Sequence, residues 1–128
     1  MSNDTQPTSP AIIEDPRKLN TTIPAFHVGV GGGTIRVEHS PQEIPLDDPR
    51  STYSFFPEQK PFLVTSAVSQ DIPHSVILAC LHQLMLFAKK HNGLDYLQSF
   101  KVEGCSESLW FIEDGDGGAI TALFPSDY

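Results

Sequence analysis

The sequence contains a run of glycines, Gly31–Gly33, of the kind that can bring backbone N–H groups against a phosphate. A dinucleotide-binding loop needs a third spaced glycine, and Thr34 stands at that position. No Gly-Lys-Ser/Thr triplet ends the run, so it also departs from the phosphate-binding loop of nucleotide hydrolases. The flanking residues alternate between apolar and polar, so the glycines predict the turn of a β-hairpin.

A second run, Glu113–Gly118, carries three acidic side chains and raises the possibility of a calcium-binding loop. With Asp114 as the first ligand, Asp116 takes the third position correctly. The fifth position holds Gly118 instead of an acid, and Pro125 occupies the twelfth, where a bidentate glutamate is required. The run therefore predicts a solvated acidic turn, with weak cation binding as the alternative.

Five histidines and two cysteines are the other residues able to bind metal or act as nucleophiles. His74, His82 and His91 fall in one predicted helix, but their spacing does not place a metal-binding pair on one face. Cys105 lies in a predicted turn, where a histidine brought near by folding would make it a nucleophile. The sequence identifies no such partner, so we predict no catalytic residue, no metal ligand and no cofactor.

The overall charge argues against one large class of ligands. Sixteen acidic residues against eight basic ones give a net charge of −8, and an acidic surface repels phosphate backbones. Nucleic-acid binding is therefore not expected, except through mimicry of nucleic-acid charge. We find no signal-peptide pattern and no apolar run long enough to span a bilayer, which favours a cytoplasmic protein without membrane contact.

The elements that would position these residues follow from hydrophobic periodicity. Residues 1–22 are polar and proline-rich and predict a disordered arm, and 23–128 predict a single domain. Apolar alternation predicts strands at the following ranges: 26–30, 34–38, 62–68, 96–103, 109–113 and 119–124. A helix is predicted from about residue 73 to 92, opened by Asp71 and Pro73. The fold class is α+β, with an antiparallel sheet of β-β-β-α-β-β-β order packed on one main helix.

The long segment between residues 40 and 61 is blocked from regular structure by its prolines. It contains three aromatic residues, Tyr53, Phe55 and Phe56. Aromatic side chains in such a loop either fix it to the core or contact a partner, and we favour the first alternative.

The predicted helix is apolar over more of its circumference than one sheet face covers. Ile77, Leu81, Leu84 and Ala88 centre the apolar face. Val76, Cys80 and Phe87 widen it on one side, and Leu78 and Met85 widen it on the other. Either loops cover these flanks or a second copy does, and we predict a homodimer.

The function that the sequence favours is a non-catalytic protein-interaction or binding module, including an acidic inhibitor or regulator of another protein. Its binding residues would be Tyr53, Phe55, Phe56, Leu78 and Met85, and its partner another protein or itself. The alternative is a small enzyme or small-molecule binder with a pocket between the sheet and the 40–61 loop, for which His39, Tyr53, Cys105 and Asp114 are the first candidates. The stretch 109–128 is broadly similar to the ends of small proteins carried by phages and plasmids, a similarity that names no family.

Overall fold

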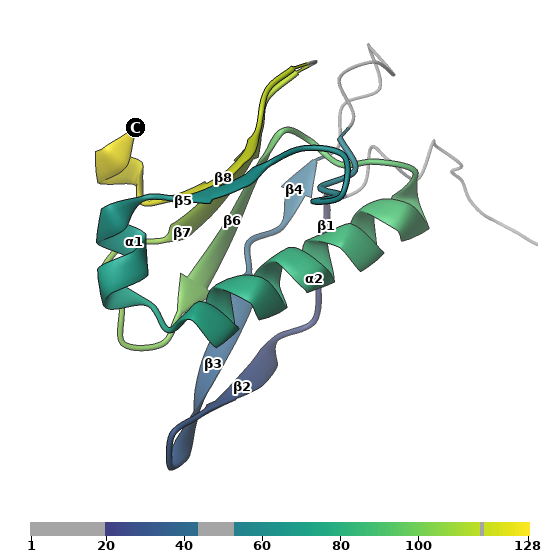
Figure 1. Cartoon of the computed structure of the whole chain (residues 1–128). Coiled ribbons are helices and arrows are strands. Elements are labelled where there is room, and N and C mark those ends of the chain that lie inside the picture. The colour runs from purple at the N-terminus through teal and green to yellow at the C-terminus, as the bar shows by residue number, and fades with distance from the viewer. Residues whose placement is uncertain (1–19, 44–52, 116) are drawn as a thin grey trace, which may run out of the picture.

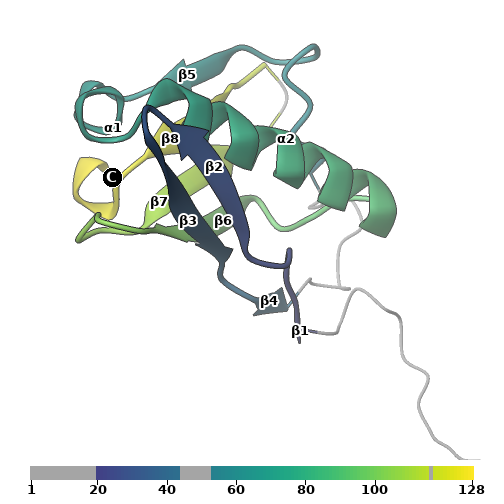
Figure 2. The same cartoon turned by 90° about the horizontal axis from the view of Figure 1, so that it is seen from below.

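The computed structural model describes residues 20–43, 53–115 and 117–128, which form an α+β fold. A curled six-stranded sheet, in the order β2-β3-β6-β7-β8-β5, packs one face against a single long helix, α2 (Figures 1 and 2). The predicted fold class is confirmed in this respect. The prediction of a purely antiparallel sheet is wrong, because β5 pairs with β8 in parallel.

The glycine run forms the predicted hairpin turn. Strands β2 (Phe26–Val30) and β3 (Gly33–His39) pair antiparallel and are joined by Gly31 and Gly32. Gly31 has a φ of 57°, a value that glycine adopts without the strain that a side chain would cause. The apolar residues of both strands share the face that packs on the core, as their alternation predicted.

The sequence prediction of one strand over 62–68 is wrong in its second half. Strand β5 is Phe62–Val64, and a short helix, α1 (Ser66–Asp71), follows directly. The Thr65 hydroxyl accepts a hydrogen bond from the Val68 N–H at 3.3 Å, and this cap starts the helix. Because α1 and α2 carry the chain back across the sheet, β5 lies parallel to β8 instead of joining an antiparallel meander.

Helix α2 (His74–His91) matches the predicted range, although its N-terminus differs from the prediction. Asp71 ends α1 and does not cap α2, whose N-cap residue is Pro73. At the other end, Asn92 has a φ of 60°, and its N–H closes the last turn on the Ala88 carbonyl. Basic residues in this last turn face the negative end of the helix dipole.

Each of the last three strands runs antiparallel to its neighbour in the sheet: β6 (Leu97–Val102), β7 (Leu109–Glu113) and β8 (Ile120–Leu123). A 3₁₀ turn, Pro125–Asp127, ends the chain. Alternate residues of the sheet point toward α2 and form one core with it. Three of these inward residues are polar and buried, namely His39, Gln98 and Glu113, and such groups require hydrogen-bond partners.

A small second sheet lies beside the main one. It consists of β1 (Asn20–Thr21) and β4 (Gln42–Glu43), so residues 20 and 21 of the predicted arm have a strand partner. The remainder of the predicted arm and residues 44–52 of the 40–61 loop lie outside the described residues. In the described part of the chain, no helix combines the length and apolarity needed to cross a membrane.

Candidate functional site

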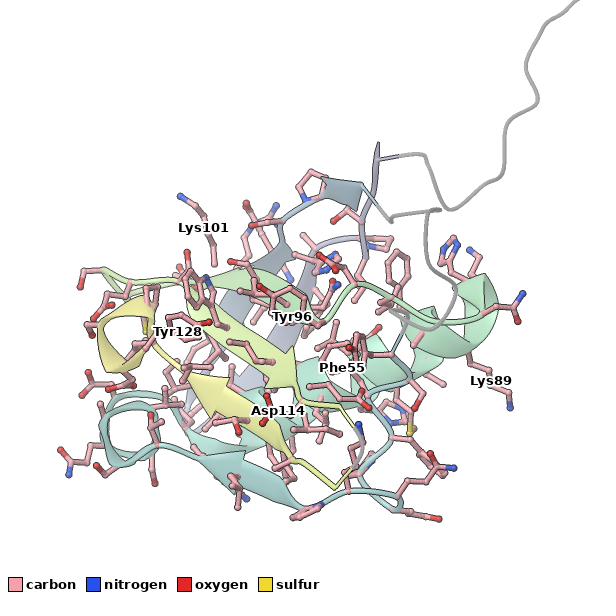
Figure 3. The ribbon with its side chains drawn as sticks, turned by 90° about the horizontal axis from the view of Figure 1, so that it is seen from above. Phe55, Lys89, Tyr96, Lys101, Asp114 and Tyr128 are labelled. Atoms are coloured by element: carbon pink, nitrogen blue, oxygen red, sulfur yellow. The ribbon has the colours of Figure 1, made fainter. Side chains whose placement is uncertain are left out.

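A groove of about 910 Å³ separates the C-terminal half of α2 from the loop 53–60. We call it the loop groove. Figure 3 shows Phe55, Lys89 and Asp114 around this end of the molecule. The described residues that line the groove are Tyr53, Ser54, Phe56, Gln59, Lys60, Met85, Leu86, Ala88, Lys89, Asn92, Gly93, Glu113 and Gly115. Of the five predicted binding residues, it brings together Tyr53, Phe56 and Met85.

Two contacts hold the loop that forms one wall of the groove. Tyr53 and Leu94 form an isolated antiparallel bridge, with N–H to carbonyl distances of 2.7 and 2.8 Å. Phe55 is 0% exposed and belongs to the core, so it fixes the loop from within. Its φ of 50° is unusual for a bulky residue and turns its neighbours Ser54 and Phe56 outward. The structure therefore places Phe55 beneath the groove, with no place in its lining.

A buried ion pair fastens the same loop to strand β7. Glu113 is 5% exposed, and its Oε1 accepts a hydrogen bond of 2.7 Å from the Phe55 N–H. Its Oε2 lies 2.8 Å from the Lys60 Nζ. The Lys60 ammonium also donates to the Asp114 carbonyl and lies 5.7 Å from the centre of the Tyr53 ring. Both charged groups are thereby engaged in holding the loop, so the described lining of the groove offers no available carboxylate base.

The other wall of the groove is apolar and comes from α2. Met85 is half-buried there, and Leu86 is 48% exposed although it is a large hydrophobic residue. The ammonium group of Lys89, one turn further along, is exposed and has no ion-pair partner among the described residues. Helical periodicity places Leu86 on the solvent strip of the helix. Periodicity alone could not identify Leu86 as a groove residue, because only the position of the loop creates the groove.

The two flanks of α2 differ in how they are covered. Val76 is fully buried, and the Phe87 ring packs edge-on against His39 and His91, so the chain itself covers this flank. On the opposite flank Met85 is half-buried, and Leu78 remains 45% exposed and outside the groove. The loop thus accounts for part of the surplus apolar surface that motivated the predicted homodimer.

His39, a predicted candidate for a pocket residue, lies in the core away from the loop groove. Its Nδ1 accepts a 2.9 Å hydrogen bond from the Ile23 N–H, so the ring proton is on Nε2. Nε2 donates that proton to Gln98 Oε1 at 2.8 Å. Both ring nitrogens are therefore occupied, and the imidazole connects the N-terminal segment to strands β3 and β6.

Burial lowers the pKa of His39 from its ordinary value of 6.5, against a smaller raising effect of the Gln98 hydrogen bond. Since the unfolded chain then binds more protons than the folded one, stability falls as pH drops from about 6.5 toward the lowered pKa. We expect His39→Asn to flatten this dependence by up to about 1.4 kcal/mol per pH unit. Urea unfolding between neutral and mildly acidic pH measures this pH dependence of the free energy of unfolding. His82→Gln, on the exposed surface of the helix, is the control. An unchanged slope in His39→Asn would contradict the assignment.

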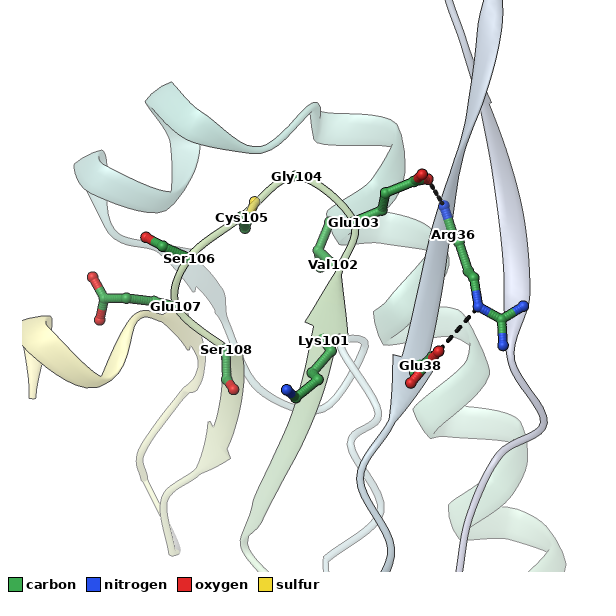
Figure 4. A pocket seen from close by; sticks show the side chains of 10 residues that line it. All are labelled: Arg36, Glu38, Lys101, Val102, Glu103, Gly104, Cys105, Ser106, Glu107 and Ser108. Atoms are coloured by element: carbon green, nitrogen blue, oxygen red, sulfur yellow. Dashed lines mark hydrogen bonds and ion pairs between the residues drawn. The ribbon is translucent and has the colours of Figure 1, made fainter.

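Cys105, the predicted nucleophile candidate, lies at a different end of the sheet in the turn between β6 and β7. The turn borders a shallow pocket of about 370 Å³ shared with Arg36 and Glu38 (Figure 4). Burial, and then the carboxylate of Asp71, raises the pKa of the Cys105 thiol, which keeps it protonated. No histidine is among the described residues that line this pocket, so the histidine partner that would make Cys105 a nucleophile is not found there.

The four residues singled out for a catalytic pocket are thus not brought together. Tyr53 lines the loop groove and Asp114 lies beside it, bonded to Lys60 only through its backbone carbonyl. His39 and Cys105 lie elsewhere. Asp116 of the acidic turn is outside the described residues, and among those that are described no three potential metal ligands cluster.

The structural role of Glu113 was missed from the sequence, where it stands out only as part of the acidic turn. One signal was available, because Leu109 and Phe111 alternate with it on the inward face of β7. An acid at the third inward position of a strand is buried and needs a partner, which Lys60 supplies. Function has to be inferred from these side chains alone, because no family model, characterised protein or solved structure shows significant similarity to the chain.

Proposed function

We propose that this domain is a non-catalytic protein-interaction module whose loop groove binds an apolar segment of another protein. One observation carries the proposal, namely an apolar wall with an exposed leucine facing a loop that a buried ion pair fastens to strand β7. A loop fixed before binding costs little ordering entropy when the ligand arrives, which favours affinity. The charged groups at the base of the groove serve structure, and this supports binding over catalysis.

The chemistry of the groove indicates the kind of segment. Phe56, Met85 and Leu86 offer apolar contacts, and burial of one such side chain contributes roughly 1.5–3 kcal/mol. Lys89 at the rim adds a positive charge suited to a carboxylate of the ligand. A segment with two or three apolar side chains and an acidic residue fits both features.

The test uses a peptide selected from a random-peptide display library on the full chain, followed by calorimetric titration. Leu86→Glu should weaken binding of that peptide by about tenfold or more, since a charge replaces an apolar contact. Leu78→Glu is the matched control, because Leu78 lies on the same helix at nearly the same exposure but outside the groove. Both variants change an exposed residue, so both should fold.

The two variants separate the possible outcomes. Loss of affinity in Leu86→Glu alone supports binding of the peptide in the loop groove. Equal loss in both variants would indicate a general effect of charge on α2, and no loss in either would place the peptide elsewhere. Either of these last two results would overturn the proposed site.

The alternative function, a small-molecule binder, would use the same groove. Its volume of about 910 Å³ lies within the range of about 300–1,000 Å³ found for ligand pockets. A thermal-shift screen of small apolar acids separates the two proposals. Stabilisation by such a compound that Leu86→Glu abolishes, without selection of any peptide, would favour the small molecule.

Two further proposals, an acidic inhibitor and a homodimer, have less support than peptide binding in the groove. An acidic inhibitor that imitates a polyanion is supported only by the net charge of −8. A homodimer remains a proposal as well, and its interface is better sought away from α2, because the loop and the core cover much of the helix.

A further inference from the structure

Strand β2 is an edge of the six-stranded sheet, and no other strand among the described residues pairs with its outer side. Natural edge strands are usually protected from pairing by lysine, proline, a bulge or short length. The opposite edge, β5, is three residues long and follows Pro61. Strand β2 has five residues, Phe-His-Val-Gly-Val, with no lysine, acid, proline or bulge among them. Neither its length nor its residue types therefore protect it against pairing.

The backbone of β2 presents hydrogen-bonding groups to this free edge. Arg36 lies opposite His27 and makes its backbone hydrogen bonds on the β6 side. Its N–H donates to the Glu103 carboxylate, and its carbonyl accepts from the Glu103 N–H, at 2.9 Å each. His27 and Arg36 are therefore a pair without mutual hydrogen bonds. By the same alternation, the N–H and carbonyl groups of His27 and Gly29 point away from β3.

We propose that β2 pairs antiparallel with β2 of a second copy of this chain, with the twofold axis at Val28. In that register His27 faces Gly29 of the second copy, and the two exchange backbone hydrogen bonds on each side of the axis. Phe26 then faces Val30 of the second copy on the inner face. The two sheets join into one continuous sheet.

Three features make a second copy the occupant. The register is self-complementary, because the two edge residues with outward backbone groups lie symmetrically about Val28. A Cβ atom added at Gly29 would meet no atom within 4 Å beyond its chain neighbours, so this position leaves space for the His27 ring of the second copy. An uncharged strand also lets two chains approach although each carries a net charge of −8.

Pairing would also complete the burial of the apolar residues at this edge. Phe26, Val28 and Val30 pack against the core but are only partly buried, since no strand among the described residues covers the outer side of β2. A second copy of the strand would cover their exposed sides. A polar peptide would gain little free energy from these apolar contacts. A second copy of β2 is therefore the better partner for this edge.

Disulfide formation between two copies of the chain tests the proposed register of the β2 pair directly. In the proposed pairing, the Val28 Cα atoms of the two copies are about 4.5 Å apart, within the range of about 4.4–6.8 Å for a disulfide. Val30 and its copy are offset by four residues, or roughly 13 Å, which is too far. In a Cys105→Ser background, where Cys80 is buried, Val28→Cys should form a covalent dimer on oxidation and Val30→Cys should not.

Light scattering after size-exclusion chromatography tests the same surface without crosslinking. The wild-type chain should show twice its 14.1 kDa mass, and Gly29→Lys should return it to the monomer by placing a charge beside the axis. Thr34→Lys is the matched control, since Thr34 pairs with Gly29 on the adjacent strand and is also exposed. It adds the same charge away from the free edge and should remain a dimer.

The proposal does not depend on the loop groove, so Leu86→Glu should leave the dimer intact. A wild-type monomer throughout a dilution series, or a dimer that Gly29→Lys does not dissociate, would overturn it. Crosslinking of Val30→Cys as readily as Val28→Cys would exclude the register. A monomeric chain that binds an extended peptide, and loses it in Gly29→Lys, would replace the second copy with that peptide.

Discussion

Replacing Glu113 by alanine is expected to lower the free energy of unfolding by about 3–5 kcal/mol. The carboxylate is 5% exposed and has two partners, the Phe55 N–H and the Lys60 ammonium. Its removal leaves the Phe55 N–H without its acceptor and leaves Lys60, which keeps only the Asp114 carbonyl, without its counter-charge in a partly buried site. An unpaired charge is costly there. Urea unfolding followed by the fluorescence of Trp110, the single tryptophan, measures the loss.

Two related variants test whether the ion pair is the cause. Glu113→Gln keeps an acceptor for the Phe55 N–H but loses the charge opposite Lys60, so its loss should be smaller than that of Glu113→Ala. Lys60→Met should also destabilise the fold, because the buried Glu113 charge is then unpaired. If Glu113→Ala changes stability by less than about 1 kcal/mol, the loop is held by other contacts and the carboxylate is available to a ligand.

The same contacts explain how far the sequence could predict this fold. The hairpin of β2 and β3 and the helix α2 follow local rules, glycines in a turn and a period of 3.6 residues, and both were predictable. The parallel pairing of β5 with β8 joins residues about sixty positions apart, which no local pattern encodes. Thr65 caps a helix within an apolar run that also suits a strand, and this ambiguity moved the predicted end of β5.

The candidate site was predictable only in part, for a similar reason. Tyr53 and Phe56 stood out as aromatic residues in a long loop, and Met85 as a surplus apolar residue on the helix. Lys60 and Glu113 were not singled out as partners, because an ion pair between residues more than fifty positions apart leaves no trace in sequence spacing. Leu86 was assigned to the solvent strip, which is correct for its exposure but not for its place in the groove.

Replacing Phe55 by alanine is expected to cost about 3–5 kcal/mol, the range for removal of a buried aromatic ring. The ring is fully buried in the core, and the cavity that it leaves lies directly below the loop groove. Peptide binding should weaken in parallel, since Phe55 fixes the wall that carries Tyr53 and Phe56. Phe56→Ala is the matched control, because Phe56 lines the groove and is only half-buried. It should weaken binding with a smaller loss of stability.

Comparison of Phe55→Gly with Phe55→Ala separates the ring from the backbone. Glycine is normally less stable than alanine inside regular structure by roughly 0.5–1 kcal/mol. At a φ of 50° an alanine side chain bears a left-handed strain of roughly 1–2 kcal/mol, from which glycine is free. Phe55→Gly should therefore be at least as stable as Phe55→Ala in urea unfolding. If it is clearly less stable, the backbone at Phe55 is not left-handed, and the orientation of Phe56 toward the groove loses its structural basis.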